Sequence, residues 1–457
     1  MPEVAGPMLN QSVSQSVSRR TMLRSSAMIG VGAAAATLPF SGPAFARESA
    51  AVRWPTVANL VRGYVERDIV PCMVARIGLG QGEADTIAAG TRTFGGSGGV
   101  DEDTLFRIYS MTKPITGLAT VMLIDDGLLE LDQPLADVLP AFANMQVQRQ
   151  YDGPITRDNL EPAVRPITIR HLLTHTAGLG YTIVQNGPIN AAYRANGIVP
   201  GKVSNMALAQ EIFGGAPAPS LADFADGLAE LPLVYQPGTR WSYSVGLDLL
   251  GRVIEVASGQ DFASFLEDRI FTPCGMTSTG FRVKREDVQR FTGNYFLLGG
   301  IPVPIDLPSS SVYLDEPAFP FGGAGLVSSA RDYDRFLQML AGRGVIEDTQ
   351  VTSAAAVDLA TSDLFPETLA SNGRFQRNGR SFGFGAGGLV GTGETEGLFG
   401  WFGAAGTVGL VNKRWGLRHT LMTQYMPVDA YDVQGDFPLA VANDMARLAR
   451  NWPRSVD

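Results

Sequence analysis

The stretch Leu105-Phe106-Arg107-Ile108-Tyr109-Ser110-Met111-Thr112-Lys113 leads into the apolar segment Ile115–Asp125. That segment predicts a buried helix, and Pro114 suits its first turn. Ser110 and Lys113 are three residues apart, about one helical turn, so their side chains share a face. A serine at a helix start lies near the positive end of the helix dipole. A neighbouring lysine can take its proton, as an activated nucleophile requires.

The lysine content makes this pair more specific. The chain has four lysines, and only Lys113 follows a serine by three residues. Because a Ser-x-x-Lys pattern at a helix start also arises by chance, two further segments matter. Residues 237–246 form a turn that places Tyr243 just before an apolar helix. Residues 400–407 are rich in small side chains, which let a strand approach a substrate closely.

Together with Ile169–Leu179 and Gly322–Ser329, these segments resemble the serine β-lactamase-like family. Within it, the chain is most similar to the family VIII carboxylesterases and the class C β-lactamases. The resemblance covers nearly all of the chain after residue 46. It implies a β-lactamase/transpeptidase-like fold of the α/β (α+β) class. Such a fold has a mixed, mainly antiparallel sheet flanked by helices, and an inserted, mainly helical domain.

The resemblance also implies roles for individual residues. Ser110 would be the acylated nucleophile, and Lys113 and Tyr243 would share proton transfer. Which of these two is the main base stays open. The backbone N–H groups of Ser110 and Ala404 would form the oxyanion hole. The resemblance implies neither a metal nor a cofactor.

Two motifs depart from the β-lactamase pattern. Val245 stands where β-lactamases have the asparagine of Tyr-x-Asn, and Trp401-Phe402-Gly403 stands where they have Lys-Thr-Gly. The lost groups hold the amide and carboxylate of a β-lactam, so a charged penicillin is expected to bind poorly. The esterase branch has Trp-Gly-Gly, so the Phe402 ring either narrows the pocket or points into the core. We expect substrate contacts from Tyr109, Val245, Trp401, Phe402 and Gly403.

Other candidate motifs lack the context that they need. Gly95–Gly99 matches Gly-x-Ser-x-Gly, but no buried strand precedes Ser97 and no helix follows it. Gly383–Gly388 matches Gly-x-Gly-x-x-Gly without a following helix, so it is expected to form turns between strands. His171 and His175 lack the intervening glutamate of a metalloprotease, and we expect them to make local hydrogen bonds.

Strands are predicted near both ends of the chain, with mostly helices between them. The predicted strands are Met73–Leu79, Ala84–Ala89, Gly406–Asn412 and Arg418–Gln424. The other predicted helices are Val57–Asp68, Ile169–Thr174, Ala207–Phe213, Gly246–Ala257, Asp261–Ile270, Arg331–Ala341 and Leu439–Asn451. We therefore expect an α/β domain from residues 47–130 and 310–457, with a mainly helical domain, 131–309, inserted between them.

The first 46 residues read as an export signal. Arg19-Arg20 belongs to a Ser-Arg-Arg-x-x-Leu motif of the twin-arginine type, an apolar stretch spans Ala27–Leu38, and Ala44-Phe45-Ala46 forms a cleavage site. The apolar stretch is shorter than the ~20 residues that cross a bilayer, so no stable membrane anchor is expected. The sequence predicts a periplasmic or secreted protein that begins at Arg47, which N-terminal sequencing checks.

Charge and cysteine content narrow the range of partners. The chain carries a formal net charge of −9 and has no basic stripe, which argues against nucleic acid as a partner. Export permits a disulfide, but Cys72 and Cys274 lie in apolar segments and are expected to be two buried thiols. The expected partner is a small-molecule ester or amide. The sequence makes no prediction of the oligomeric state.

Three functions are compatible with these residues. The first is an exported carboxylesterase that acts through an acyl-enzyme on Ser110. The second is an amide or peptide hydrolase on the same site, such as a D-amino-acid peptidase or a β-lactamase-like enzyme. The third is a non-catalytic binding protein, against which the intact Ser110, Lys113 and Tyr243 argue. Turnover of esters, compared with amides and a cephalosporin, separates the first two.

Overall fold

The computed structural model describes residues 49–206, 210 and 214–451. The predicted export signal and all but one residue of the predicted helix at 207–213 lie outside the described residues. None of the helices in the described part of the chain is long and apolar enough to cross a membrane.

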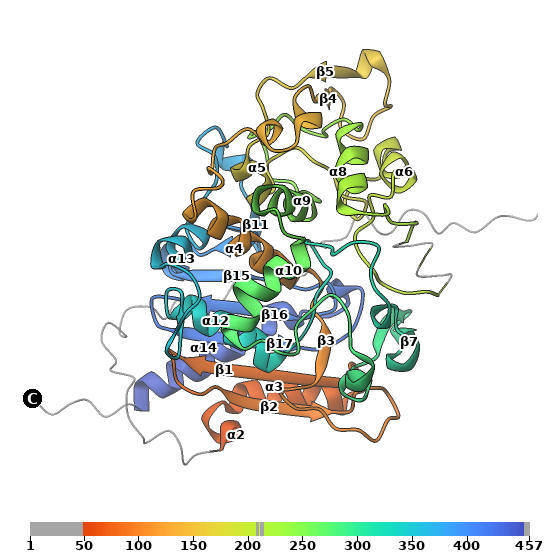
Figure 1. The fold of residues 1–457 in the computed structure, drawn as a ribbon. Coiled ribbons are helices and arrows are strands. Elements are labelled where there is room, and N and C mark those ends of the chain that lie inside the picture. Colours follow the sequence, from red (N-terminus) through yellow and green to blue (C-terminus); the bar gives the residue numbers. More distant parts are fainter. Residues whose placement is uncertain (1–48, 207–209, 211–213, 452–457) are drawn as a thin grey trace, which may run out of the picture.

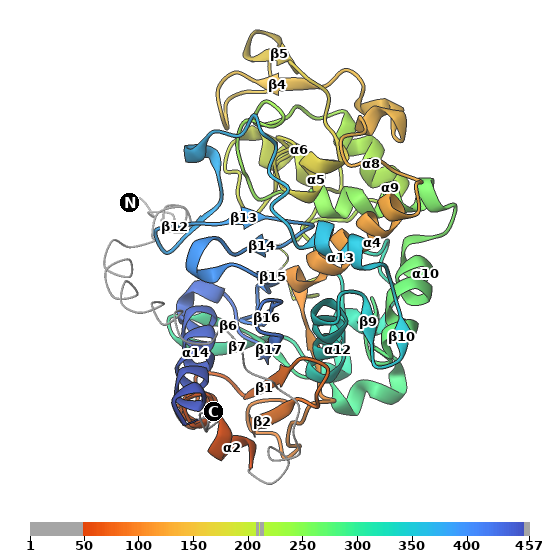
Figure 2. The same cartoon turned by 90° about the vertical axis from the view of Figure 1, so that its left-hand side faces the viewer.

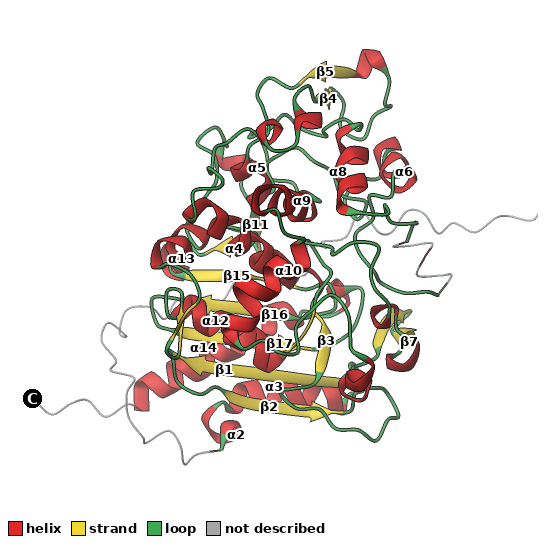
Figure 3. Ribbon diagram, in the orientation of Figure 1, coloured by secondary structure: helices red, strands yellow, loops and turns green. Residues whose placement is uncertain are grey.

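A seven-stranded sheet forms the centre of the fold (Figures 1 and 3). Its strand order, β13-β14-β15-β16-β17-β1-β2, joins the N-terminal and C-terminal parts of the chain, and every pairing in it is antiparallel. The predicted, mainly antiparallel sheet is thus confirmed. The bounds are β1 Cys72–Leu79, β2 Asp85–Gly90, β13 Gly383–Phe384, β14 Leu389–Val390, β15 Leu398–Phe402, β16 Val408–Asn412 and β17 Leu417–Met422.

Helices cover both faces of this sheet (Figure 2). α3 (Pro55–Glu66) and α14 (Val433–Asn451) pack together on one face. α12 (Ala330–Ala341) packs on the other face, against β1, β16 and β17. The position of α12 follows from its sequence, because buried side chains such as Tyr333 and Leu337 recur at helical spacing.

A group of helices lies beyond the edge of the sheet, toward the top of Figure 1. α4 (Thr112–Asp125) links this group to the sheet, because it packs against α9, α13 and β15. One hydrophobic core includes Leu118, Val253 and Phe336, so it extends over both predicted domains, and the division at residues 131 and 309 stays a prediction. The helices of this region are α5 Ile169–Leu173, α6 Pro188–Ala195, α8 Leu221–Ala229 and α9 Gly246–Ser258. α10 Phe262–Leu266, which continues into a π turn at Glu267–Phe271, and α13 Ala354–Ala360 lie lower and pack against α4, at the level of β14 and β15 (Figure 2).

Short strand pairs complete the described part of the chain. β3 pairs antiparallel with β8 beside the start of α4. The short strands are β3 Leu105–Arg107, β4 Gln146–Gln148, β5 Leu160–Pro162, β6 Asn294–Leu298, β7 Ile301–Asp306, β8 Val327–Ser329, β9 Val345–Ile346, β10 Thr349–Gln350, β11 Gln376–Arg377 and β12 Arg380–Ser381. Two short helices, α2 Ala50–Arg53 and α11 Thr272–Cys274, remain.

Most predicted boundaries differ from the structure by one to a few residues, as for the helix predicted from Ile115, which begins at Thr112, and two further differences concern the C-terminal part of the chain. The strand predicted from Gly406 begins at Val408, because residues 403–406 form a tight turn in which Gly406 has φ +88°. The helix predicted from Leu439 begins at Val433, so Pro438 lies inside α14 rather than before it. Both differences leave the sheet order and the position of the helices unchanged.

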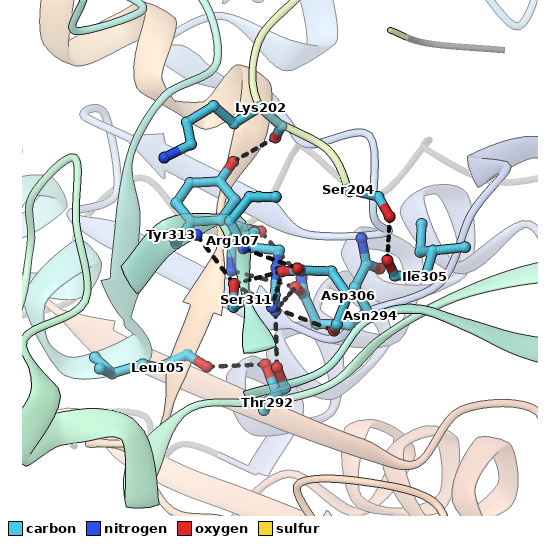
Figure 4. Close-up of polar contacts among 12 residues, drawn as sticks. Leu105, Arg107, Lys202, Ser204, Thr292, Asn294, Ile305, Asp306, Ser311 and Tyr313 are labelled. Carbon is cyan, nitrogen blue, oxygen red and sulfur yellow. Dashed lines mark hydrogen bonds and ion pairs between the residues drawn. The ribbon is translucent and has the colours of Figure 1, made fainter. Parts of the chain in front are cut away.

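A fully buried arginine fixes β3 (Figure 4). Arg107 donates from Nε to Asp306 Oδ2 (2.8 Å) and from Nη1 to the carbonyl oxygen of Thr292 (2.7 Å). Asp306 also accepts a hydrogen bond from Ser311 Oγ (2.6 Å). The guanidinium carbon lies 4.0 Å from the centre of the Phe291 ring. Because Arg107 ends β3 just before Ser110, this network holds the strand that leads to the candidate nucleophile.

Replacing the Asp306 carboxylate tests how much the Arg107–Asp306 ion pair stabilises the folded protein. Asp306→Asn should destabilise the fold by about 3–5 kcal/mol, because it leaves a buried arginine without its opposite charge. Chemical denaturation measures the difference. Glu316→Gln is the matched control, since the Arg282–Glu316 pair is largely exposed and should contribute less than about 1 kcal/mol. Equal effects of the two substitutions would contradict the anchoring role of Arg107.

Candidate active site

Ser110 lies in a short 3-10 turn (Tyr109–Met111) between β3 and α4. The turn is strained at Tyr109, a bulky residue with φ +42°. Tyr109 is buried, and its hydroxyl accepts a hydrogen bond from Asn294 Nδ2 (2.9 Å), which holds the ring in place. Ser110, 9 % exposed, is therefore presented from a turn that its neighbours fix.

The structure brings the three predicted catalytic side chains together. The Tyr243 hydroxyl donates to Ser110 Oγ at 2.7 Å, and Lys113 Nζ lies 3.3 Å from the same oxygen. Lys113 is fully buried, and Nζ also donates to the carbonyl oxygen of Gly323 (2.6 Å). The serine hydroxyl is thus within reach of two groups that can exchange a proton with it.

Tyr243 is positioned by aromatic neighbours and by the turn before α9. Trp401 Nε1 donates to the Tyr243 hydroxyl (3.3 Å), and the His175 ring centre lies 4.8 Å from that of Tyr243. Ser244, the next residue, shares a hydrogen bond with His175 Nδ1 (2.9 Å). His175 itself has φ +54° and is 1 % exposed, so it is a second strained, buried residue beside the site.

The third predicted motif lies at the end of β15. Trp401 pairs with Gly409 of β16, and both Trp401 and Phe402 are mostly buried in one aromatic cluster. A side chain at Gly403 would lie 2.5 Å from the carbonyl oxygen of Ile108, so only glycine fits beside the strand that leads to Ser110. The substrate contacts predicted for Trp401, Phe402 and Gly403 stay predictions. The same holds for Tyr109 and for Val245, and Val245 is fully buried at the start of α9.

The proposed oxyanion-hole residue Ala404 follows this motif. The Gly403 N–H donates to the carbonyl oxygen of Thr407 (2.9 Å) and is therefore occupied. The Ala404 N–H donates to no acceptor in the part of the chain that the structure describes. It is consequently free to donate to a substrate oxygen, which the predicted role requires.

A buried carboxylate, Asp248, is a site residue that the sequence analysis missed. Asp248 Oδ1 accepts a hydrogen bond from the Gly323 N–H (2.8 Å), and the carbonyl oxygen of the same glycine accepts from Lys113. Burial raises the pKa of Asp248 to about 6, against the lowering effects of the Lys113 charge and the Gly323 N–H. The signal was present in the sequence, because Asp248 is the only charged residue among the apolar ones that open α9, residues 246–250.

The histidine beside the site is electrically neutral. Burial is the main cause that holds the pKa of His175 well below its usual range, and the charge of Lys113 is the second. His171 has the local role that was predicted, because its Nδ1 accepts from the Thr168 N–H (3.1 Å) at the start of α5.

Ser97 remains outside the site, because it is exposed in a loop that no helix directly follows. Gly383–Gly388 contains β13 and the turn to β14, and it packs beside the site, since a side chain at Gly387 would clash with the carbonyl oxygen of Lys113. Cys72 and Cys274 are free and buried, so the prediction of two buried thiols is confirmed. The described residues contain no group of three or more histidine, cysteine or acidic side chains that could hold a metal ion.

The raised pKa of Asp248 predicts a pH-dependent effect of Asp248→Asn on stability. A carboxyl whose pKa is higher in the folded state stabilises the fold at low pH, and this contribution is lost as pH rises through about 6. Asparagine does not ionise, so the variant should gain stability relative to the parent by on the order of 2 kcal/mol between pH 4 and pH 8. Urea unfolding across that range measures it.

Asp261→Asn is the control for this experiment. The hydrogen bond with Ser264 lowers the pKa of this exposed helix-capping carboxyl, so the trend with pH should have the opposite sign. A stability difference for Asp248→Asn that stays constant with pH would mean that Asp248 does not ionise in the folded protein near pH 6.

Comparison with known proteins identifies the family of the chain. The Beta-lactamase family model matches residues 57–444. Esterase EstB of Burkholderia gladioli is 32% identical over 383 residues, 76% of this chain and 83% of that protein. Lovastatin esterase of Penicillium rubens is 28% identical over 384 residues, 77% of this chain and 87% of that protein. The solved structure of EstCE1, a hydrolase with promiscuous acyltransferase activity, aligns with a TM-score of 0.67 at 23% identity, over 86% of this chain and 98% of that chain. The chain therefore belongs to the β-lactamase family, as a serine hydrolase near the family VIII esterases.

Proposed function

We propose that the protein is an exported carboxylesterase that forms an acyl-enzyme on Ser110. The observation that carries the proposal is the position of Ser110 Oγ, 2.7 Å from the Tyr243 hydroxyl and 3.3 Å from Lys113 Nζ. A serine hydroxyl is a weak nucleophile on its own, and two proton-exchanging neighbours at hydrogen-bond distance activate it. The export signal predicted before Arg47 supports a periplasmic or secreted location.

Acylation begins with attack of Ser110 Oγ on the ester carbonyl carbon. As the bond forms, the hydroxyl proton passes to Lys113 or Tyr243, and the carbonyl oxygen becomes an oxyanion that the N–H groups of Ser110 and Ala404 stabilise. Collapse of this intermediate breaks the bond to the alcohol oxygen, which leaves with a proton from the same pair of groups.

Deacylation reverses these roles. Water attacks the acyl carbon, its proton passes to the Lys113–Tyr243 pair, and the Ser110 oxygen takes a proton back as the carboxylic acid leaves. An alcohol in place of water would give acyl transfer. The structural similarity to EstCE1, a hydrolase with promiscuous acyltransferase activity, makes this the side reaction to test.

The ester preference rests on what replaces the β-lactamase motifs. Trp401 stands where a lysine would hold the carboxylate of a β-lactam, and its indole N–H donates to Tyr243 instead (3.3 Å). Val245 offers no polar group for an amide and is fully buried. Similarity to esterase EstB and lovastatin esterase supports the same choice. Amide or peptide hydrolysis on the same serine remains the alternative.

A turnover panel tests the proposal. Short-chain aryl esters should be hydrolysed much faster than matched anilides and a chromogenic cephalosporin, because the polar groups that hold an amide and a β-lactam carboxylate are missing. Ser110→Ala should abolish ester turnover, whereas Ser97→Ala should leave it near the parent value. Cephalosporin turnover with negligible ester hydrolysis would contradict the proposal. In the presence of a primary alcohol, the ratio of carboxylic acid to new ester among the products measures how the acyl group divides between water and the alcohol.

A further inference from the structure

One arginine beside the site has no partner. Three arginines lie on or next to the β11–β12 hairpin. Arg374 pairs with Asp363, and Arg380 Nη1 lies 3.9 Å from Glu394 Oε2. In contrast, Arg377 makes no ion pair and no side-chain hydrogen bond within the described residues, and its guanidinium lies over an aromatic ring.

The aromatic ring belongs to Phe402. The guanidinium carbon of Arg377 lies 3.8 Å from the centre of this ring, a stacking distance at which the edge N–H groups of the guanidinium remain free. Arg377 is partly buried, and this burial lowers the pKa of its guanidinium to about 10. The charge of Asp432 opposes that shift, but no Asp432 oxygen comes within ion-pair distance. A partly desolvated guanidinium whose N–H donors are unpaired can form strong, charge-assisted hydrogen bonds with an anion.

The cation is connected to the nucleophile through three aromatic residues. The ring centres of Phe402 and Trp401 are 6.0 Å apart, and Trp401 contacts Tyr243, which contacts Ser110. Arg377 therefore lies beside the same motif, residues 401–403, in which the β-lactamase lysine is missing. The same contact suggests a role for Phe402, which departs from the Trp-Gly-Gly motif of the esterase branch. Its ring packs against the face of the Arg377 guanidinium.

We propose that Arg377 binds a carboxylate of the substrate, so that the enzyme prefers esters that carry an anionic group. The guanidinium edge can donate two parallel hydrogen bonds to such a carboxylate while its face stays on Phe402. The inference rests on the proposed esterase function and adds a substrate class to it. The carboxylate can belong to the acyl group or to the alcohol, and the test distinguishes the two.

Two matched substrate pairs test the proposal. p-Nitrophenyl hexanoate and mono-p-nitrophenyl adipate differ by a carboxylate on the acyl group. Phenyl butyrate and 4-carboxyphenyl butyrate differ by a carboxylate on the leaving group. For each pair, the ratio of kcat/KM for the anionic ester to that for the neutral ester is measured in the parent, in Arg377→Gln and in Arg377→Lys. Arg380→Gln is the control, because it removes one positive charge from the same hairpin.

Arg377→Gln should lower this ratio by about 10- to 100-fold for at least one pair, as loss of a charge-assisted hydrogen bond does. In Arg377→Lys, which keeps the positive charge, the ratio should lie between the values for Arg377→Gln and the parent. A ratio unchanged in both pairs would overturn the proposal, as would an equal fall in Arg380→Gln, which would indicate only a general effect of charge. If the parent hydrolyses none of the four esters, the proposed esterase function fails instead. Thermal unfolding of each variant confirms that it is folded.

Discussion

The amino group of Lys113 is fully buried, and the arrangement of the site follows from the need to satisfy it. It donates to Ser110 Oγ and to the carbonyl oxygen of Gly323. It also lies 4.6 Å and 5.5 Å from the ring centres of Tyr243 and Tyr181. These partners come from the start of α4, the loop before β8, the turn before α9 and the segment after α5. Satisfying this one lysine therefore requires four segments that lie far apart in the sequence to meet at one point.

The electrostatic surroundings of Lys113 restrict which groups can exchange protons near Ser110. Burial and the lysine charge hold the pKa of His175 well below its usual range, so this imidazole takes no proton near neutral pH. Asp248, with a pKa of about 6, is ionised above that pH and supplies a negative charge on the far side of Gly323. In the proposed mechanism, proton exchange with Ser110 is thereby left to Lys113 and Tyr243, and the neighbouring groups act by position and charge.

Local patterns predicted most of the fold and the core of the site. The helix from Ile115, the strands at both ends of the chain and the Ser110–Lys113 spacing depend on neighbours in sequence, and the structure contains all of them. Tyr243 was identified through the family resemblance, because its approach to Ser110 spans 133 positions of the chain. Asp248 and Arg377, the residue proposed to bind a substrate carboxylate, were not identified. The lone charge of Asp248 among apolar residues marks it in the sequence, but the sequence does not show what Asp248 or Arg377 contacts. Their environments, a glycine that Lys113 also contacts and the ring of Phe402, are made by tertiary packing.

The identity of the nucleophile is the central claim, and covalent labelling tests it most directly. A fluorophosphonate probe should form a single adduct, which peptide mass spectrometry should place on Ser110. Ser110→Ala should not be labelled. Lys113→Ala should fold yet be labelled more slowly by about 10²–10⁴-fold, since it lacks one of the two proton-exchanging groups. An adduct on Ser97, or full labelling of Lys113→Ala, would contradict the account.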